Sequence, residues 1–148
     1  MNRLILTLAL AAALPAAHAS VGAPDLSKVN GSLTAEAGKT YGDIDTVNGS
    51  ITLEDKAVAR NVETVNGSIT LEPFARALDV STVNGRILLR NGAAARSVET
   101  VNGSIVGVSN LRVEKTVEAV NGSIELGAHS LVGGNVETVN GSIKLLSM

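Results

Sequence analysis

Apolar and polar positions alternate in short runs along most of the chain, and Asn-Gly pairs interrupt these runs at regular intervals. Ile51 and Leu53 alternate with polar neighbours, and Ile69 and Leu71 do the same one repeat later. A period of two with many β-branched residues predicts short strands. The Asn-Gly pairs predict bends, because asparagine and glycine adopt a positive φ at low cost. We therefore expect an all-β chain, with three short strands and three bends in each repeat.

The repeat itself determines the expected architecture. The string Val-Asn-Gly-Ser-Ile recurs with small changes at intervals of 18 or 19 residues, beginning at Val29, Val47, Val65, Val83, Val101, Val120 and Val139. A lone repeat has no core, whereas stacked repeats about 4.8 Å apart pair each strand with its copies above and below. The pattern predicts a single-stranded parallel β-solenoid, right-handed, with about 6.5 turns. Its expected turns are 26–43, 44–61, 62–79, 80–97, 98–116, 117–135 and a partial turn at 136–148.

Equivalent residues of stacked turns form columns along the solenoid axis. Three columns are expected to point inward: the motif valines from Val47 on, the isoleucines from Ile51 on, and the leucines from Leu53 on, with Gly107 interrupting the third. Each buried aliphatic side chain contributes about 1.5–3 kcal/mol. Such columns would hold the fold together without disulfides.

An asparagine occupies the same position in every turn, which predicts a column of amides that hydrogen-bond to one another along the axis. Six of the seven lie in Asn-Gly-Ser sequons, so glycosylation is the competing interpretation. Asn84-Gly85-Arg86 loses the sequon but keeps Asn-Gly, which favours the structural role. The expected ladder consists of Asn30, Asn48, Asn66, Asn84, Asn102, Asn121 and Asn140.

The first 19 residues have the three parts of a secretory signal peptide: Arg3, an apolar run over residues 4–14, and Ala17-His18-Ala19. The apolar run is shorter than the roughly 18 residues that a transmembrane helix needs, and Pro15 follows it. We expect cleavage between Ala19 and Ser20, a cap segment at 20–25, a repeat domain at 26–148, and no transmembrane segment after cleavage. The expected location is the periplasm or the cell surface.

Composition argues against several classes of function. The chain has no cysteine, which excludes disulfides and thiolate chemistry, and its net charge of −2 does not suggest a nucleic-acid partner. One Tyr, one Phe and no Trp leave little surface for stacking sugars or bases. His129, the one histidine after the leader, is expected on the surface rather than in a catalytic triad or a metal site. We predict no enzyme activity, no cofactor and no metal site.

A row of acidic residues is the most distinctive chemical feature. Its members occupy one position per turn on the outward side, interrupted at Ser81: Asp45, Glu63, Glu99, Glu118 and Glu137. Like charges about 5 Å apart repel mildly, so the row is either a solvated stripe or a surface that attracts a divalent cation. The first interpretation is favoured. The threonines beside the row are ascribed to β-propensity rather than to ice binding.

The C-terminal end of the repeat region lacks a visible cap. The chain ends as Lys144-Leu145-Leu146-Ser147-Met148, and neither a helix nor a charged segment follows. Solenoid ends expose core residues and unpaired strand edges, so they normally need a cap. Either this end folds over itself or it stacks on a second copy, and a homo-oligomer through Leu145, Leu146 and Met148 is favoured.

The motif Val65-Asn66-Gly67-Ser68-Ile69 resembles that of a bacterial family of adhesin-like β-strand-repeat proteins of unknown function, over residues 26–148. A more distant similarity is to the bactofilins, which are polymer-forming solenoids. The resemblance implies a cell-envelope protein with a structural or interaction role. The expected function is thus a non-enzymatic, exported interaction module. The alternative is a binding module that holds a cation, a glycan or an envelope polymer on the acidic row or on a flat face.

Overall fold

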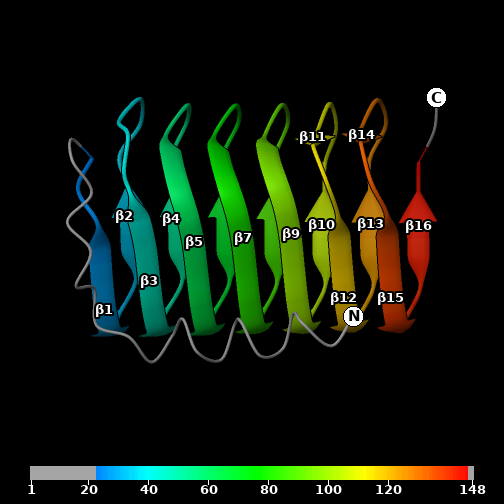
Figure 1. Cartoon of the computed structure of the whole chain (residues 1–148), viewed down its shortest axis with the longest axis horizontal. Helices are drawn as coiled ribbons and strands as arrows, with labels where there is room; N and C mark the ends of the chain where they lie inside the picture. The colour runs from blue at the N-terminus through cyan, green and yellow to red at the C-terminus, as the bar shows by residue number, and fades with distance from the viewer. Residues whose placement is uncertain (1–22, 147–148) are drawn as a thin grey trace.

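The computed structural model describes residues 23–146, and these residues form strands, bends and turns with no helix. The expected signal peptide, its cleavage point at Ala19–Ser20, and Met148 lie outside this range. Figure 1 shows strands stacked side by side along one axis. All strand pairs are parallel, and residues one turn apart face each other, as Asn48 faces Asn66 and Ile51 faces Ile69. The predicted parallel β-solenoid is confirmed.

The strands form two sheets, here called the long sheet and the short sheet. The long sheet contains β1 (Leu26–Asn30), β3 (Asp43–Asn48), β5 (Val58–Asn66), β7 (Arg76–Asn84), β9 (Ala94–Asn102), β11 (Arg112–Val113), β12 (Val117–Asn121), β14 (Leu131–Val132) and β15 (Val136–Asn140). The short sheet contains β2 (Leu33–Ala35), β4 (Ile51–Leu53), β6 (Ile69–Leu71), β8 (Ile87–Leu89), β10 (Ile105–Gly107), β13 (Ile124–Leu126) and β16 (Ile143–Leu145). In Figure 1 the chain descends the nearer, long sheet and ascends the farther, short sheet as it advances, which is a right-handed coil.

The number of strands per turn differs from the expected three. In β5, β7 and β9 two of the expected strands merge into one strand of nine residues. Each long strand carries two consecutive residues that are not buried, such as Arg60 and Asn61, between the buried Ala59 and Val62. The strand bends at this point, which replaces the third corner. The next turn is one residue longer, and there the strand is divided into β11 and β12.

This bend explains an error in the expected core. The isoleucine and leucine columns point inward as predicted, and Ile51, Ile69, Leu53 and Leu71 are fully buried. The motif valines do not: Val65 is only partly buried and faces outward, while the inward positions belong to residues such as Val62 and Thr64. Because the two outward residues at the bend shift the alternation by one position, the valines exchange faces with the threonines.

The buried threonines have a role beyond β-propensity. Thr46, Thr64 and Thr82 are almost completely buried, and their hydroxyl groups donate to glycine carbonyl oxygens of the preceding turn at 3.0–3.2 Å. A buried hydroxyl needs such a partner, because leaving it unsatisfied costs about 1–3 kcal/mol. The threonine column therefore joins successive turns at the Asn-Gly corner.

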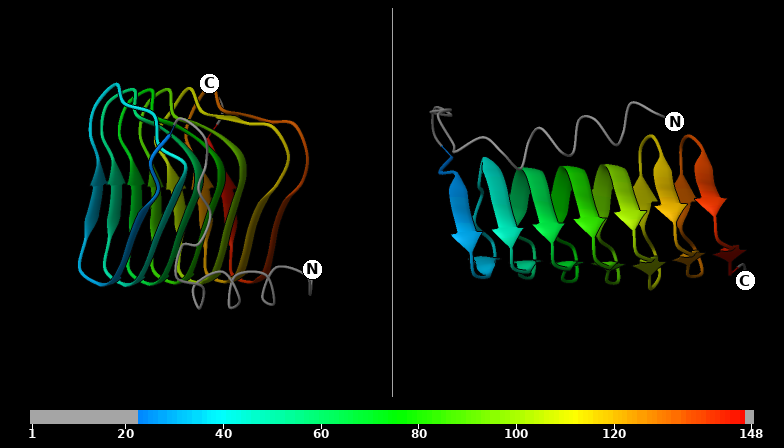
Figure 2. Two further views of the ribbon diagram at one scale, coloured as in Figure 1. Left: turned by 60° about the vertical axis from the view of Figure 1, so that its left-hand side comes forward. Right: turned by 90° about the horizontal axis from the view of Figure 1, so that it is seen from below.

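Six of the seven motif glycines are required for close approach, and two of the seven, Gly31 and Gly122, have a positive φ, of 125° and 157°. A Cβ on Gly67 would lie 1.9 Å from the carbonyl oxygen of Gly49, one turn earlier. A left-handed backbone also occurs at the opposite edge, where Lys56, Phe74, Asn110 and His129 have φ values of 53–63°. Figure 2 shows these tips protruding together along one edge of the solenoid.

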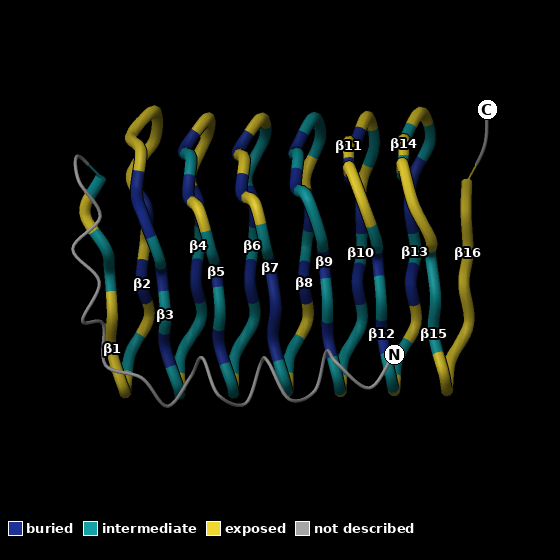
Figure 3. Tube along the Cα trace, viewed as in Figure 1, coloured by how far each residue is buried: buried dark blue, intermediate teal, exposed yellow. Residues whose placement is uncertain are grey.

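The core runs through the whole solenoid between the two sheets. In Figure 3 the buried positions form continuous bands along the central strands, whereas β16 is exposed throughout. Exposure at the last turn follows from stacking, because each turn is covered by the next one and the last described turn has no successor. The two ends of the solenoid are thus chemically different from its sides.

Candidate functional site

The acidic row lies on the outer face of the long sheet, in one registered column. Asp45 faces Glu63, Ser81 separates Glu63 from Glu99, and Glu118 lies between Glu99 and Glu137. Successive members are about 4.8 Å apart along the axis. All of the acidic members are partly buried, since the motif valines form a parallel column on the same face. The row is therefore less solvated than the sequence indicates.

Partial burial changes the acidity of the row. Burial raises the pKa of Glu63 to about 7, and the charge of the neighbouring Asp45 adds to the rise. Burial and the charge of Glu118 raise the pKa of Glu99 to about 7, and burial raises the pKa of Asp45 to about 6. One carboxylate oxygen of Glu63, Oε2, is buried without a hydrogen-bond partner. Protons therefore neutralise part of the row near pH 7.

The arrangement of acidic groups is linear. Among residues 23–146, no three His, Cys, Asp or Glu side chains gather in a way that could hold a metal ion. A calcium ion takes six to eight oxygen ligands from several directions, and a single column offers ligands from one direction only. His129 lies exposed at a tip of the solenoid, as predicted.

The asparagine ladder is complete. The amide Nδ2 of each asparagine donates to Oδ1 of the asparagine one turn earlier, at 2.9–3.0 Å across all six steps from Asn30 to Asn140. The ladder lies on the exposed corner that joins the two sheets rather than in the core. All bonds have the same direction, so the ladder has a polarity. Asn30 keeps an amide donor and Asn140 keeps Oδ1 without a ladder partner within the described residues.

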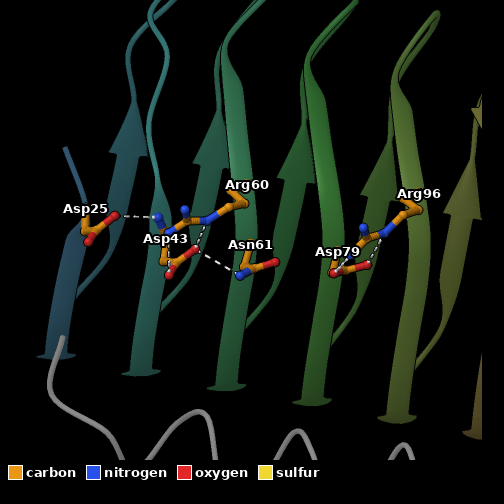
Figure 4. A network of polar contacts seen from close by, with 6 residues as sticks. All are labelled: Asp25, Asp43, Arg60, Asn61, Asp79 and Arg96. Carbon is orange, nitrogen blue, oxygen red and sulfur yellow. Dashed lines mark hydrogen bonds and ion pairs between the residues drawn. The ribbon is translucent and has the colours of Figure 1, made fainter. Parts of the chain in front are cut away.

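Ion pairs at the bend of the long strands were not anticipated from the sequence. Asp43 accepts from Arg60 at 2.9 and 3.0 Å and from the amide of Asn61 at 2.9 Å, and Figure 4 shows this network. Asp79 and Arg96 repeat the arrangement two turns later. The hydrogen bonds from Arg96 and Ser97 outweigh burial and lower the pKa of Asp79. In the sequence, the 17-residue spacing that Asp43–Arg60 and Asp79–Arg96 share was the signal that could have predicted these ion pairs.

The C-terminal turn exposes residues that are core residues elsewhere. Ile143 and Leu145 of β16 and the following Leu146 are all exposed. The equivalent Ile124 and Leu126, one turn earlier, are buried. Of the residues expected to stack, Leu145 and Leu146 are therefore at the end surface, and Met148 lies outside the described range.

Comparison of the chain with protein-family models, with curated proteins and with solved structures finds no match. Within residues 23–146 there is no helix long and apolar enough to cross a membrane. The fold is thus the firm basis for a functional proposal.

Proposed function

We propose that the protein is an exported, non-enzymatic structural module of the cell envelope, whose copies join end to end. The observation that supports this most directly is the uncovered last turn. Ile143 is 41% exposed and Leu145 is 60% exposed, whereas Ile124 and Leu126 are 0% and 3% exposed one turn earlier. A further turn, or the first turn of a second copy, is the surface that would bury them.

The direction of the hydrogen bonds favours head-to-tail joining over a symmetric pair. Within the solenoid the amides of Gly31 and Leu33 donate to carbonyl oxygens of the next turn. The amides of Gly141 and Ile143 hold the corresponding positions at the C-terminal edge, and the carbonyls of Asn30 and Ser32 hold the accepting positions at the N-terminal edge. The two ends of the asparagine ladder are also complementary. Asn140 offers Oδ1 at the C-terminal edge, and Asn30 offers Nδ2 at the N-terminal edge.

Lys28 opposes this association. It occupies an inward position of the first strand, is exposed, and its Nζ lies 3.5 Å from the carbonyl oxygen of Ser32. A charged side chain at an inward position of an edge strand hinders edge-to-edge pairing. Docking of a second copy therefore requires Lys28 to move aside.

The magnitudes indicate a weak association. Complete burial of three half-exposed aliphatic side chains contributes about 3 kcal/mol, and several edge hydrogen bonds contribute about 1 kcal/mol each. Association costs at least about 4 kcal/mol in lost translational and rotational freedom. The net gain is thus at most about 4 kcal/mol, which corresponds to a dissociation constant of about 1 mM or weaker.

Two sequence features support the assignment to the envelope. Residues 1–19 have the pattern of a secretory signal peptide. The motif Val65–Ile69 resembles that of the adhesin-like β-strand-repeat family, and the distantly similar bactofilins are polymer-forming solenoids. A rigid rod of stacked turns is suited to a structural role, because each turn pairs its backbone with two neighbours.

Light scattering over a concentration series tests the proposal. The mass of the wild-type protein should rise with concentration, whereas Leu145→Asp should stay at the mass of one chain. Leu78→Asp is the matched control, since Leu78 is 42% exposed on the side of the solenoid. Lys28→Thr should strengthen the association. A wild-type mass of one chain at all concentrations, or equal effects of the two Asp variants, would refute the proposal.

A further inference from the structure

A groove with a volume of about 840 Å³ runs along the outer face of the long sheet, beside the tips. Its floor follows one registered column across five turns: Thr40, Val58, Arg76, Ala94 and Arg112. Four spacings of about 4.8 Å give it a length of roughly 19 Å parallel to the axis. The volume is within the range of about 300–1,000 Å³ that is typical of small-molecule sites. The groove is separate from the solenoid ends.

Most of the lining is apolar or glycine, and Phe74 and Leu78 form part of its wall. The ring of Phe74 lies over Gly92, where a Cβ would be only 2.6 Å from the ring. Phe74 is 52% exposed and has a φ of 63°, a conformation that bulky residues rarely adopt. The only phenylalanine of the chain thus occupies a strained and exposed position that gains little from burial in the core. Contact with a ligand would explain this placement.

The charged residues of the groove are mainly arginines. Arg60 and Arg96 are held by Asp43 and Asp79 at the bend. Arg76 and Arg112 have no ion-pair partner among the described residues, and the small Ala94 lies between them. Their backbones are two turn spacings apart, about 10 Å. This part of the groove is therefore suited to a negatively charged group that either guanidinium can reach.

We propose that the groove binds a single-chain anionic amphiphile, namely a long-chain carboxylate. The carboxylate would pair with Arg76 or Arg112, and the apolar chain would lie along Val58, Phe74 and Leu78. A groove that is mostly apolar does not suit a polyanion, which would present charge along its whole length.

Titration calorimetry with saturated carboxylates of eight to fourteen carbons, each below its micelle concentration, tests the ligand class. Complete burial strengthens binding about fourfold per methylene, and a chain left half in water should gain about twofold per methylene. The alcohol of the same length lacks the charge, so it should bind at least about fivefold more weakly. Binding that does not depend on chain length, or equal binding of carboxylate and alcohol, would overturn the proposal.

Variants locate the site on the full chain. Arg76→Ala combined with Arg112→Ala should weaken carboxylate binding about tenfold, and Ala94→Glu should abolish it by placing a carboxylate between the two arginines. Arg86→Ala is the matched control, because Arg86 is exposed outside the groove, and it should bind like the wild type. Circular dichroism confirms that each variant is folded. Equal carboxylate binding by Arg86→Ala and Ala94→Glu would refute the assignment. A protein that binds anionic vesicles but no free carboxylate would refute it as well.

Discussion

Replacement of Glu63 by glutamine should stabilise the protein above neutral pH. Glu63 faces Asp45 in the acidic row, and its Oε2 is buried without a hydrogen-bond partner. Burial and neighbouring acidic groups raise its pKa from 4.5 to about 7. The folded protein therefore binds more protons than the unfolded chain between these values. The contribution of Glu63 to the free energy of unfolding is therefore highest below about pH 4.5, falls as the pH rises to about 7, and is level above that.

The magnitude follows from the size of the shift. A rise from 4.5 to about 7 corresponds to at most about 3.5 kcal/mol, at about 1.4 kcal/mol per pH unit. Because the side chain is only partly buried, solvent screening reduces this to about 1–2 kcal/mol. Glutamine has nearly the same shape and no charge. We expect Glu63→Gln to exceed the wild type by about 1–2 kcal/mol at pH 8 and to equal it at pH 4.

Urea unfolding of both proteins at pH 4 and pH 8 measures this difference. Other carboxylates also titrate in this interval, but they do so in both proteins and cancel in the comparison. Glu125→Gln is the control, since Glu125 lies on the short sheet and pairs with Lys144 at 3.8 Å. It should give no gain at pH 8. The reasoning fails if Glu63→Gln is not more stable than the wild type at pH 8, or if the difference is the same at both pH values.

Four further outcomes are expected. Gly67→Ala should destabilise the protein by about 3 kcal/mol in urea unfolding, because its Cβ would lie 1.9 Å from a carbonyl oxygen of the preceding turn. Gly38→Ala is the control, and it should cost only about 1 kcal/mol because the space around Gly38 is open. Equal losses in the two variants would contradict the close-approach argument. Asn66→Ala removes two ladder bonds and should lower the unfolding free energy by about 1–2 kcal/mol, so an unchanged value would mean that the ladder contributes nothing. Arg96→Ala should cost about 1 kcal/mol, and this loss should shrink in 1 M salt; a loss that is insensitive to salt would exclude an ionic origin. Millimolar calcium should leave the melting temperature unchanged, since the acidic row offers ligands from one direction only, and a clear rise would restore the cation-binding interpretation.

Much of the fold was predictable because the stacking of identical turns converts a sequence repeat directly into spatial columns. The spacing of the Asn-Gly motif was enough to predict the parallel register and the column of asparagines. The isoleucines and leucines of the short strands were also assigned correctly, since Ile51 and Leu53 lie in a three-residue strand with no internal bend. The acidic members of the row were placed in one column for the same reason.

The tertiary structure alone decided which way the long strands face. Two successive outward residues at Arg60–Asn61 shift the alternation, and local periodicity carries no signal for the position of such a bend. The inward role of Thr64 and the outward position of Val65 follow from that shift. The bend also brings Arg60 to the aspartate of the preceding turn, and it opens the groove in front of Arg76 and Arg112. The sequence determined the columns, whereas the path of the backbone between the corners determined which columns form the core and which form a surface.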